Sequence, residues 1–350
     1  MSRFLTEILE QPESLNATLD YYAGAFGQKV LKRIGDLFKK KNFREVIFTG
    51  MGSSYFASYA ACSLYTSLGI RAFVINASEL LYYYFPIITE KTLLVCVSQS
   101  GESAEIVKLM EKLPENVTCI GITNDEESSL KTKVKDTLPM NAGKEEMTST
   151  KTYTSTILVL FILGWYLSDL WGKGKIEQVG RLVTSTRDVL TNKRESIIER
   201  FASLGDVGFA QFIGRGPLYS AALQGELMFK EAAKVPAAGA LGGEFRHGPM
   251  EMVKPGFNSI LFAAEGPTYA QSIRMATDIA GYQGKVLLIT NNNLKISENG
   301  ITIIVVPEPD EFLFSIQGII PVQLMAHHLA RNNGFEPGSF VHGSKVTVTE

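Results

Sequence analysis

Two serine-rich turns are the part of this sequence best suited to bind an anion. S-Q-S-G-E-S at Ser98–Ser103 follows a continuous apolar run, and Gly52-Ser53-Ser54 follows an earlier one. A helix N-terminus offers unpaired N–H groups and a partial positive charge, serine hydroxyls add donors, and glycine allows close backbone approach. Neither turn contains Lys or Arg. The turns therefore predict a phosphate site that works through dipoles and hydroxyls; the alternative is that these serines are only helix N-caps.

Nucleotide-binding signatures do not match these turns. The pattern G-x-x-x-x-G-K-[ST] is absent, and Gly50-x-Gly52 is not followed by the third glycine of a dinucleotide fingerprint. A nucleotide P-loop is therefore excluded, and an NAD site is not expected.

Glu231 is a candidate for proton transfer. It shares a helix face with Gln224 and Met228, at spacings i, i+4 and i+7. A carboxylate on a mostly apolar face tends toward a raised pKa, which suits a group that moves a proton. The alternative is a solvent-facing glutamate near the helix end that pairs with a lysine.

His247 is the second candidate. It lies in G-G-E-F-R-H-G-P, after the small-residue segment Ala237–Gly243, which we expect to be a loop. A histidine held in a rigid loop near ligand-binding turns is a candidate general acid or base. The neighbours His327 and His328 lie on an expected helix, where a structural role is more plausible.

The chain contains the same module twice, and each copy begins with a turn that has two glycines, Gly50-x-Gly52 in the first and Gly214-x-Gly216 in the second. Superposing Gly50 on Gly214 also brings Gly52 onto Gly216, an offset of 164 residues, and Ile122-Thr123-Asn124 recurs as Ile289-Thr290-Asn291, an offset of 167 residues. Two landmarks at nearly constant spacing indicate duplication.

Strands alternate with helices in both copies, which predicts parallel, doubly wound sheets of an α/β fold. The expected strands are Val46–Phe48, Leu93–Val97, Thr118–Ile122, Val207–Ile213, Ser259–Ala263 and Lys285–Ile289. The expected helices are Ser54–Leu68, Ala104–Leu113, Met147–Trp171, one from Tyr219 and Phe312–Asn332. We expect a helical extension at 1–34, a first subdomain with its connecting helix at 35–191, a second subdomain at 192–333 and a tail at 334–350.

Composition narrows the class of protein. Apolar residues make up 45% and charged residues 20% of 350 residues, with a net charge of −2. These values fit a globular protein of two ordinary domains and give no charge-driven nucleic-acid or membrane partner. No Cys/His cluster suggests a metal, the N-terminus lacks a signal-peptide pattern, and the longest apolar run, Ile157–Leu167, is too short to span a bilayer. The expected compartment is the cytosol.

Five ordered motifs make this sequence resemble the sugar isomerase (SIS) family, in particular the isomerase half of glucosamine-6-phosphate synthases. The motifs are T-G-M-G-S-S-Y, S-Q-S-G-E-S, S-T-K at Ser149–Lys151, G-R-G-P-L-Y…K-E and E-F-R-H-G-P, with K-V-T-V-T near the C-terminus. Stand-alone glucosamine-6-phosphate deaminases and fructosamine-6-phosphate deglycases also resemble this chain. The resemblance implies two tandem SIS subdomains of flavodoxin-like fold, a phosphosugar between them, a homodimer, and no cofactor.

The resemblance also assigns roles to residues. The positions that match the family's phosphate-holding residues are Ser54, Ser98, Gln99, Ser100 and Ser103, and those that match sugar contacts are Ser53 and Ser149. Glu231 matches the proton-transferring carboxylate. His247 matches the ring-opening histidine, which relatives supply from the partner subunit. Lys345 matches the lysine of the tail that closes over the substrate.

Two departures from the synthase pattern bear on the reaction. The synthase has a lysine where this chain has Met228, and that lysine forms a Schiff base with fructose 6-phosphate; it has a glutamate where this chain has Gln224. A methionine cannot form an imine. The amidotransferase domain with its N-terminal cysteine is not seen in this sequence, so we do not expect glutamine-dependent synthesis.

The expected function is therefore the isomerising deamination of a hexosamine 6-phosphate, such as glucosamine 6-phosphate or an epimer, without metal or cofactor. One alternative is a deglycase that splits a fructosamine 6-phosphate into glucose 6-phosphate and an amine, since the same Glu and His would suffice. A second alternative is a non-catalytic phosphosugar sensor, although no basic helix-turn-helix pattern is visible in residues 1–34.

Overall fold

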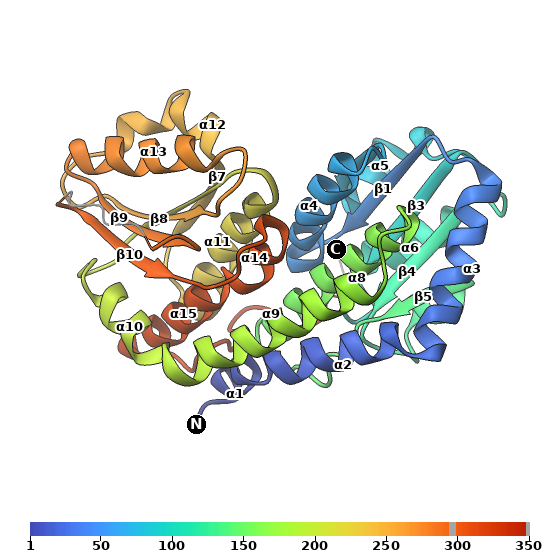
Figure 1. Ribbon diagram of the computed structural model, residues 1–350, viewed down its shortest axis with the longest axis horizontal. Coiled ribbons are helices and arrows are strands. Elements are labelled where there is room, and N and C mark those ends of the chain that lie inside the picture. The colour runs from blue at the N-terminus through green and yellow to red at the C-terminus, as the bar shows by residue number, and fades with distance from the viewer. Residues whose placement is uncertain (294–298, 348–350) are drawn as a thin grey trace. The chain divides into compact units, whose positions relative to one another are not determined.

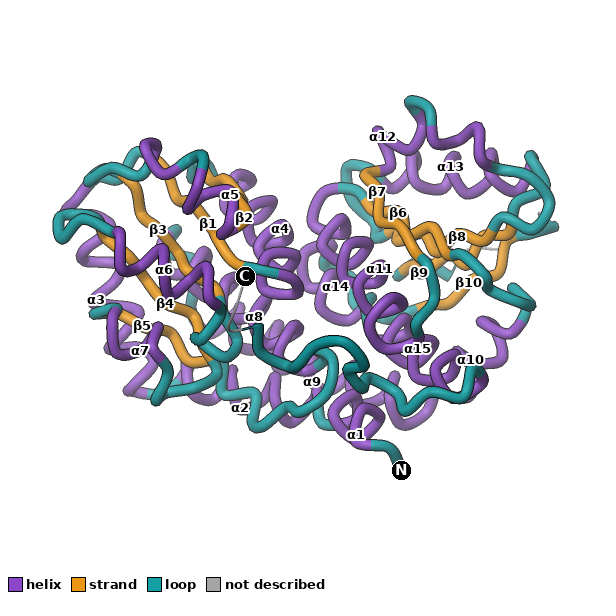
Figure 2. Tube along the Cα trace, turned by 180° about the vertical axis from the view of Figure 1, so that it is seen from behind, coloured by secondary structure: helices purple, strands orange, loops and turns teal. Residues whose placement is uncertain are grey.

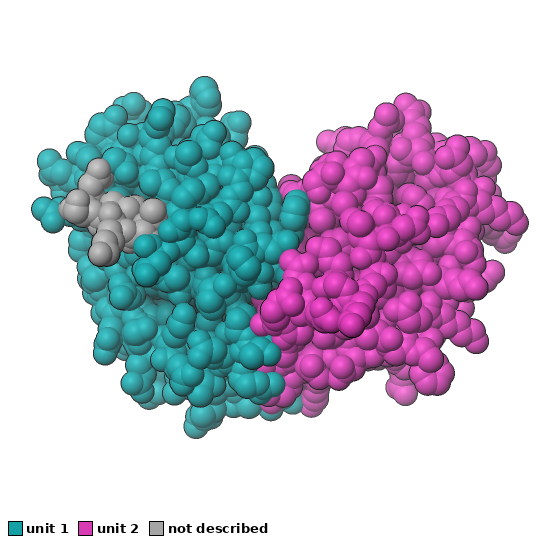
Figure 3. All heavy atoms as spheres, viewed as in Figure 1, with its two compact units in different colours: residues 1–9, 146–148, 184–340 teal, residues 10–145, 149–183, 341–350 magenta. Residues whose placement is uncertain are grey.

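A computed structural model describes residues 1–293 and 299–347. The chain folds into two compact units, coloured in Figure 3. Unit 1 comprises residues 1–9, 146–148 and 184–340, and unit 2 comprises residues 10–145, 149–183 and 341–350. The helix α9 (Lys173–Asn192) connects them along the chain.

Unit 2 contains a five-stranded, fully parallel sheet in the order β2-β1-β3-β4-β5. Its strands are β1 (Glu45–Gly50), β2 (Ala72–Asn76), β3 (Thr92–Val97), β4 (Thr118–Thr123) and β5 (Asp136–Pro139). β3 is buried along its whole length, as a continuous apolar run between two helical layers should be. This strand order is the flavodoxin-like one.

Helices cover both faces of this sheet. They are α2 (Gln11–Ala23), α3 (Ala25–Lys41), α4 (Gly52–Ser67), α5 (Ala77–Tyr82), α6 (Ala104–Lys112), α7 (Ser129–Lys133) and α8 (Lys151–Leu167), with a 3-10 turn η1 (Phe85–Ile87). Side chains of α5, α6 and α7 form one apolar cluster with Ile47, Leu94 and Cys96 of the sheet. α8 is buried almost throughout and packs against α4, where Gly164 admits the ring of Tyr65.

Unit 1 repeats the same topology, which confirms the duplication. Its order, β10-β9-β8-β6-β7, is that of the first sheet read from the other edge (Figure 2). The strands are β6 (Ala210–Gly214), β7 (Ala237–Leu241), β8 (Asn258–Ala263), β9 (Lys285–Thr290) and β10 (Ile301–Val305). Gly52 and Gly216, equated by the sequence repeat, have φ of +50° and +53°.

The helices of unit 1 also lie on both faces of its sheet (Figure 1). They are α1 (Arg3–Leu9), α10 (Arg194–Ala202), α11 (Tyr219–Ala233), α12 (Gly242–Arg246), α13 (Tyr269–Gly281), α14 (Glu311–Gln317) and α15 (Ile320–Asn332), with 3-10 turns η2 (Gly216–Leu218) and η3 (Pro249–Met252). α12 and α13 pack on one face, whose apolar cluster includes Phe245 and Met275. α11, α15 and α10 lie on the other face.

Three sequence expectations were wrong in detail. Ala237–Gly243 is not a loop: Ala237–Leu241 form β7, which pairs in parallel with β6. The helix expected at Met147–Trp171 begins only at Lys151 and ends at Leu167. The helix expected at Phe312–Asn332 is two helices, because Pro321 lacks an N–H and its ring opposes the carbonyl four residues earlier.

The stretch Glu311–Asn332 is also the one helical segment, within the residues described, that is long and apolar enough to cross a membrane. Of its most apolar window, 83% is buried within the fold, as expected of a core helix.

Candidate functional site

The predicted phosphate site lies at the switch point of the first sheet. β1 and β3 are adjacent parallel strands, with Gly50 opposite Val97, so the turns that follow them leave the sheet at the same level. Helix α4 follows the first turn and α6 follows the second. Ligands of open α/β sheets bind outside the carboxyl ends of the strands at such a point. Two helix N-termini therefore point toward one place.

The serines of the second turn hold each other and the turn. The Ser98 hydroxyl accepts from the Gly101 N–H at 3.1 Å and lies 3.3 Å from the Ser103 hydroxyl. The Ser100 hydroxyl accepts from the Glu102 N–H at 3.2 Å. Gly101 has φ of +67°, which favours glycine. Ser98 is buried, and the other serines of both turns are half-buried.

These serines do not act as ordinary N-caps. Ser103 occupies the N-cap position of α6, yet its side chain makes no capping hydrogen bond, and the N-cap of α4 is Met51. A capping serine accepts from a helix N–H two or three residues later, whereas Ser98 and Ser100 accept from N–H groups of the turn that precedes α6. We call Ser53, Ser54, Ser98, Ser100 and Ser103, with the two helix N-termini, the serine cradle.

Gln99 differs from its serine neighbours. Its carbonyl accepts from the Asn124 N–H at 3.0 Å and from the Thr123 hydroxyl at 3.2 Å, which ties the turn to the end of β4. Gln99 also lines a cavity of about 760 Å³ with Tyr21, Asn141 and Lys144. The backbone of Gln99 therefore shapes the cradle.

In the second copy, a carboxylate lies against the turns that correspond to the serine cradle. The carboxylate of Glu311 lies against the turns that follow β6 and β8: a Cβ added to Gly266 would lie 2.5 Å from Glu311 Oε2, and one added to Gly216 would lie 4.0 Å from Oε1. Burial, and then the charge of Asp310, raises the pKa of Glu311. A carboxylate of the chain thus lies at the place that corresponds to the predicted phosphate site of the first copy.

The tail residue Lys345 and the S-T-K residue Ser149 are both linked to Glu145, which the sequence analysis did not select. Lys345 Nζ lies 2.6 Å from Glu145 Oε2. The Ser149 hydroxyl lies 2.8 Å from that of Thr152, which donates to Glu145 Oε2 at 2.5 Å. Because Glu145 and Glu146 are adjacent, the sequence alone does not indicate which of the two is buried. The last residues of K-V-T-V-T, 348–349, lie outside the described residues.

Glu231 and His247 belong to unit 1. Glu231 is half-buried near the end of α11, on a helix face where Gln224 and Met228 are fully buried. The Lys234 ammonium donates to the carbonyl of Glu231 and to that of Ser339. Burial lowers the pKa of Lys234, while the negative charge of Glu231 opposes this shift. Glu231 is therefore neither a fully solvated carboxylate nor a buried one.

His247 is exposed at the end of α12. Its N–H donates to the carbonyl of Glu244 at 3.0 Å, and Gly248, with φ of +132°, turns the chain into η3. His327, by contrast, is part of the packing of α15: its Nε2 lies 3.0 Å from the Ser2 hydroxyl, and burial lowers its pKa to about 4. Of these two histidines, His247 is exposed and His327 is half-buried.

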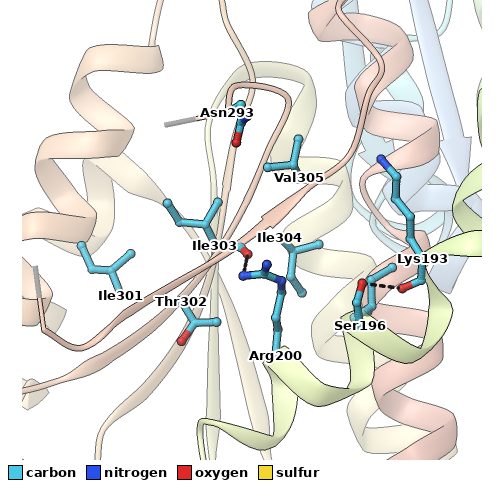
Figure 4. A pocket seen from close by; sticks show the side chains of 10 residues that line it. Lys193, Ser196, Arg200, Asn293, Ile301, Thr302, Ile303, Ile304 and Val305 are labelled. Atoms are coloured by element: carbon cyan, nitrogen blue, oxygen red, sulfur yellow. Dashed lines mark hydrogen bonds between the residues drawn. The ribbon is translucent and has the colours of Figure 1, made fainter. Parts of the chain in front are cut away.

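A cavity of unit 1, of about 630 Å³, follows the edge strand β10 (Figure 4). Arg200 donates to the carbonyl of Ile303 there at 3.0 Å. None of the predicted site residues is among the described residues that line it.

Comparison with known proteins identifies the family to which the sequence belongs. The sequence model of the SIS domain matches residues 37–164 and 204–331. The isomerizing glutamine–fructose-6-phosphate aminotransferase of Pyrococcus horikoshii is 32% identical over 343 residues, which cover 95% of this chain and 55% of that protein. The chain thus spans about half the length of the curated relatives it matches.

Two solved structures share the fold. The C-terminal domain of glucosamine-fructose-6-phosphate aminotransferase from Francisella tularensis has a TM-score of 0.87 at 24% identity, over 97% of this chain and 98% of that one. Glucosamine-6-phosphate deaminase from Thermotoga maritima has a TM-score of 0.78 at 21% identity, over 99% of both chains.

Proposed function

This chain belongs to the SIS domain family of phosphosugar isomerases, and from that premise we propose that it deaminates a hexosamine 6-phosphate, with glucosamine 6-phosphate as the first candidate. The products are a ketose 6-phosphate and ammonia. The observation that carries the proposal is the serine cradle, an uncharged donor set at a switch point whose serines do not cap their helices.

The cradle binds the phosphate group in this proposal. Ser54, Ser98, Ser100 and Ser103 donate hydrogen bonds to the phosphate oxygens, and the N-termini of α4 and α6 add partial positive charge. Ser53 and Ser149 contact the sugar. The phosphate then fixes the position of carbons one and two relative to the proton-transfer groups.

Proton transfer falls to two residues. His247, supplied by the partner subunit of a homodimer, protonates the ring oxygen and opens the pyranose. Glu231 removes the proton from C2, which carries the amine, and returns it to C1. The resulting C2 imine adds one water and releases ammonia, leaving the ketose 6-phosphate. Lys345 closes the site with the tail.

Met228 supports ammonia release over glutamine-dependent synthesis. This side chain is fully buried in α11 and has no amine, so no Schiff base with a ketose can form there. The proposed hydrolysis needs only a carboxylate, an imidazole and water. We place the reaction in the cytosol, as an enzyme that needs neither metal nor cofactor.

The test is a substrate panel with the whole chain. Glucosamine 6-phosphate, its epimers and fructosamine 6-phosphates of several amino acids are incubated with enzyme, and ammonia, free amino acid and hexose 6-phosphates are measured. Ammonia with ketose 6-phosphate supports the proposal. Release of amino acid and glucose 6-phosphate instead assigns the deglycase reaction, and binding without any turnover assigns a sensor.

Glu231→Gln tests the mechanism. The amide cannot carry the proton, so turnover should fall about 10²–10⁴-fold while phosphosugar binding in calorimetry stays within about twofold. Glu199→Gln is the matched control, since Glu199 is exposed on α10 of the same unit. Equal activity of the two variants contradicts the assignment of Glu231.

A further inference from the structure

One carboxylate that has no role in the proposed reaction accepts hydrogen bonds from several donors. Glu145 is fully buried, and its carboxylate accepts from the N–H groups of Thr150 at 2.8 Å and Thr152 at 3.2 Å. The hydroxyls of the same two threonines donate at 3.1 and 2.5 Å. Because these amides open α8, the carboxylate also lies at the positive end of that helix. A buried charge is stable only when it is paired and fully hydrogen-bonded, so this arrangement is a built acceptor for one cation.

The cation comes from the C-terminal tail. Lys345 Nζ lies 2.6 Å from Glu145 Oε2, and the lysine side chain is 21% exposed. Burial opposes the ionisation of Glu145, but the charge of Lys345 and the threonine donors outweigh it and lower the pKa of the carboxyl. The ion pair therefore persists at neutral pH.

A second bond fixes the same tail on the cradle. The carbonyl of Thr347 accepts from the Ala104 N–H at 3.2 Å, and Ala104 is the first residue of α6. Within the tail, the Ser344 hydroxyl donates to the carbonyl of Val346 at 2.6 Å. The tail residues 341–347 contain no helix or strand of their own. Tail position thus depends on bonds of this kind, one of which is at the helix N-terminus that follows Ser98–Ser103.

The carboxylate also reaches Ser149. Because Thr152 donates its one hydroxyl proton to Glu145, the Ser149 hydroxyl must be the donor in its 2.8 Å contact with Thr152. Thr152 thereby fixes the direction of the Ser149 hydroxyl proton.

We propose that Glu145 is a positioning residue of the phosphosugar site: it latches the tail onto the N-terminus of α6 through Lys345 and orients Ser149 through Thr152. Its link to sugar turnover rests on the proposed function. In this latch the Glu145–Lys345 ion pair and the Ala104–Thr347 hydrogen bond together hold the tail against α6.

Hydrogen exchange without sugar tests the latch directly. Glu145→Gln and, separately, Lys345→Met should raise exchange of the amides in residues 342–347 about tenfold or more. Amides in the middle of α8 should change less than twofold. Glu177→Gln, which removes a glutamate of an exposed pair on α9, should leave the tail unchanged. If Glu145→Gln fails to fold, Lys345→Met still decides, because Lys345 lies in the tail. Tail exchange equal to the parent's in the folded variants overturns the proposal.

Kinetics then separate this inference from the proposed function. With glucosamine 6-phosphate, Glu145→Gln should raise KM about tenfold, and adding it to Lys345→Met should cost little more, since both remove one interaction. Additive losses in the double variant count against a shared latch. If the parent turns over no hexosamine phosphate but the tail loosens in both variants, the proposed function fails and the latch stands.

Discussion

Replacing Gly101 by alanine tests whether the cradle depends on the close fit of its turn. Gly101 has φ of +67°, and an added Cβ would lie 2.3 Å from Ser128 Oγ and 2.5 Å from Ser128 Cβ. Ser128 is the N-cap of α7 and accepts from the Lys131 N–H at 3.3 Å. Its Cβ is attached to backbone, so the methyl group cannot be accommodated by a rotamer change alone. The turn between Ser98 and Ser103 must move.

The magnitude follows from three contributions. A non-glycine residue in the left-handed region costs about 1–2 kcal/mol, of which the stiffer unfolded chain returns roughly 0.4–1 kcal/mol. Over-packing adds about 1–3 kcal/mol. Gly69 provides the control, since its φ is +79° and no atom lies within 4 Å of an added Cβ. Gly69→Ala should therefore cost about 1 kcal/mol and Gly101→Ala about 2–4 kcal/mol.

The assay is thermal unfolding combined with calorimetric titration of glucosamine 6-phosphate. For a domain of about 150–250 residues, 1 kcal/mol corresponds to about 2–4 °C in Tm, so we expect losses of about 2–4 °C for Gly69→Ala and about 4–16 °C for Gly101→Ala. Only Gly101→Ala should weaken binding, by about tenfold, because it displaces hydroxyl donors of the cradle. Equal Tm losses, or unchanged binding by Gly101→Ala, would refute the reasoning.

Three further predictions follow from burial and charge. The pKa of the Glu145 carboxyl is lowered in the folded protein, so its contribution to stability should be complete above the unfolded-state pKa of about 4.3. That contribution should be lost as the pH falls through the folded-state pKa. Urea unfolding midpoints between pH 7 and 3 should show this loss in the parent protein and not in Glu145→Gln. Burial, and then the charges of Arg331, His328 and Arg194, lower the pKa of His327 from 6.5 to about 4. As the pH falls, the imidazole is therefore protonated in the unfolded chain before it is protonated in the folded protein, and stability should fall from pH 6.5 toward pH 4. His327→Gln should flatten that part of the stability profile measured with urea. Met228→Lys places an ammonium at a fully buried position, so it should lower the urea-derived stability by about 3 kcal/mol or more and yield no glutamine-dependent product; a stable variant with that activity contradicts the reading of Met228.

Local patterns were enough for the parts of the fold whose signal is confined to a few consecutive residues. The apolar run of β3 and the glycine turns after β1 and β6 were located from sequence, because burial on both faces and positive φ each restrict residue type strongly. The repeat was visible for the same reason, since Gly52 and Gly216 meet the same backbone requirement.

Other elements could not be predicted because their cause lies elsewhere in the chain. Ala237–Leu241 is composed of small residues with little strand preference, and it becomes β7 through its pairing with β6. The start of α8 at Lys151 is set by the Glu145 carboxylate, which takes the first amides of that helix. The break before Ile320 follows from Pro321, although its helical period continues on both sides.

The sequence by itself determined that this protein has two α/β modules and where the turns after β1, β3 and β6 begin, because turns and buried strands are specified by residues next to one another. Only the tertiary structure decided that Glu311 lies against the turns of the second copy, and that Glu145 joins Ser149 to Lys345. Both depend on which of the chain's many glutamates and aspartates the fold buries. The fold decides this by bringing together residues as distant as 145 and 345.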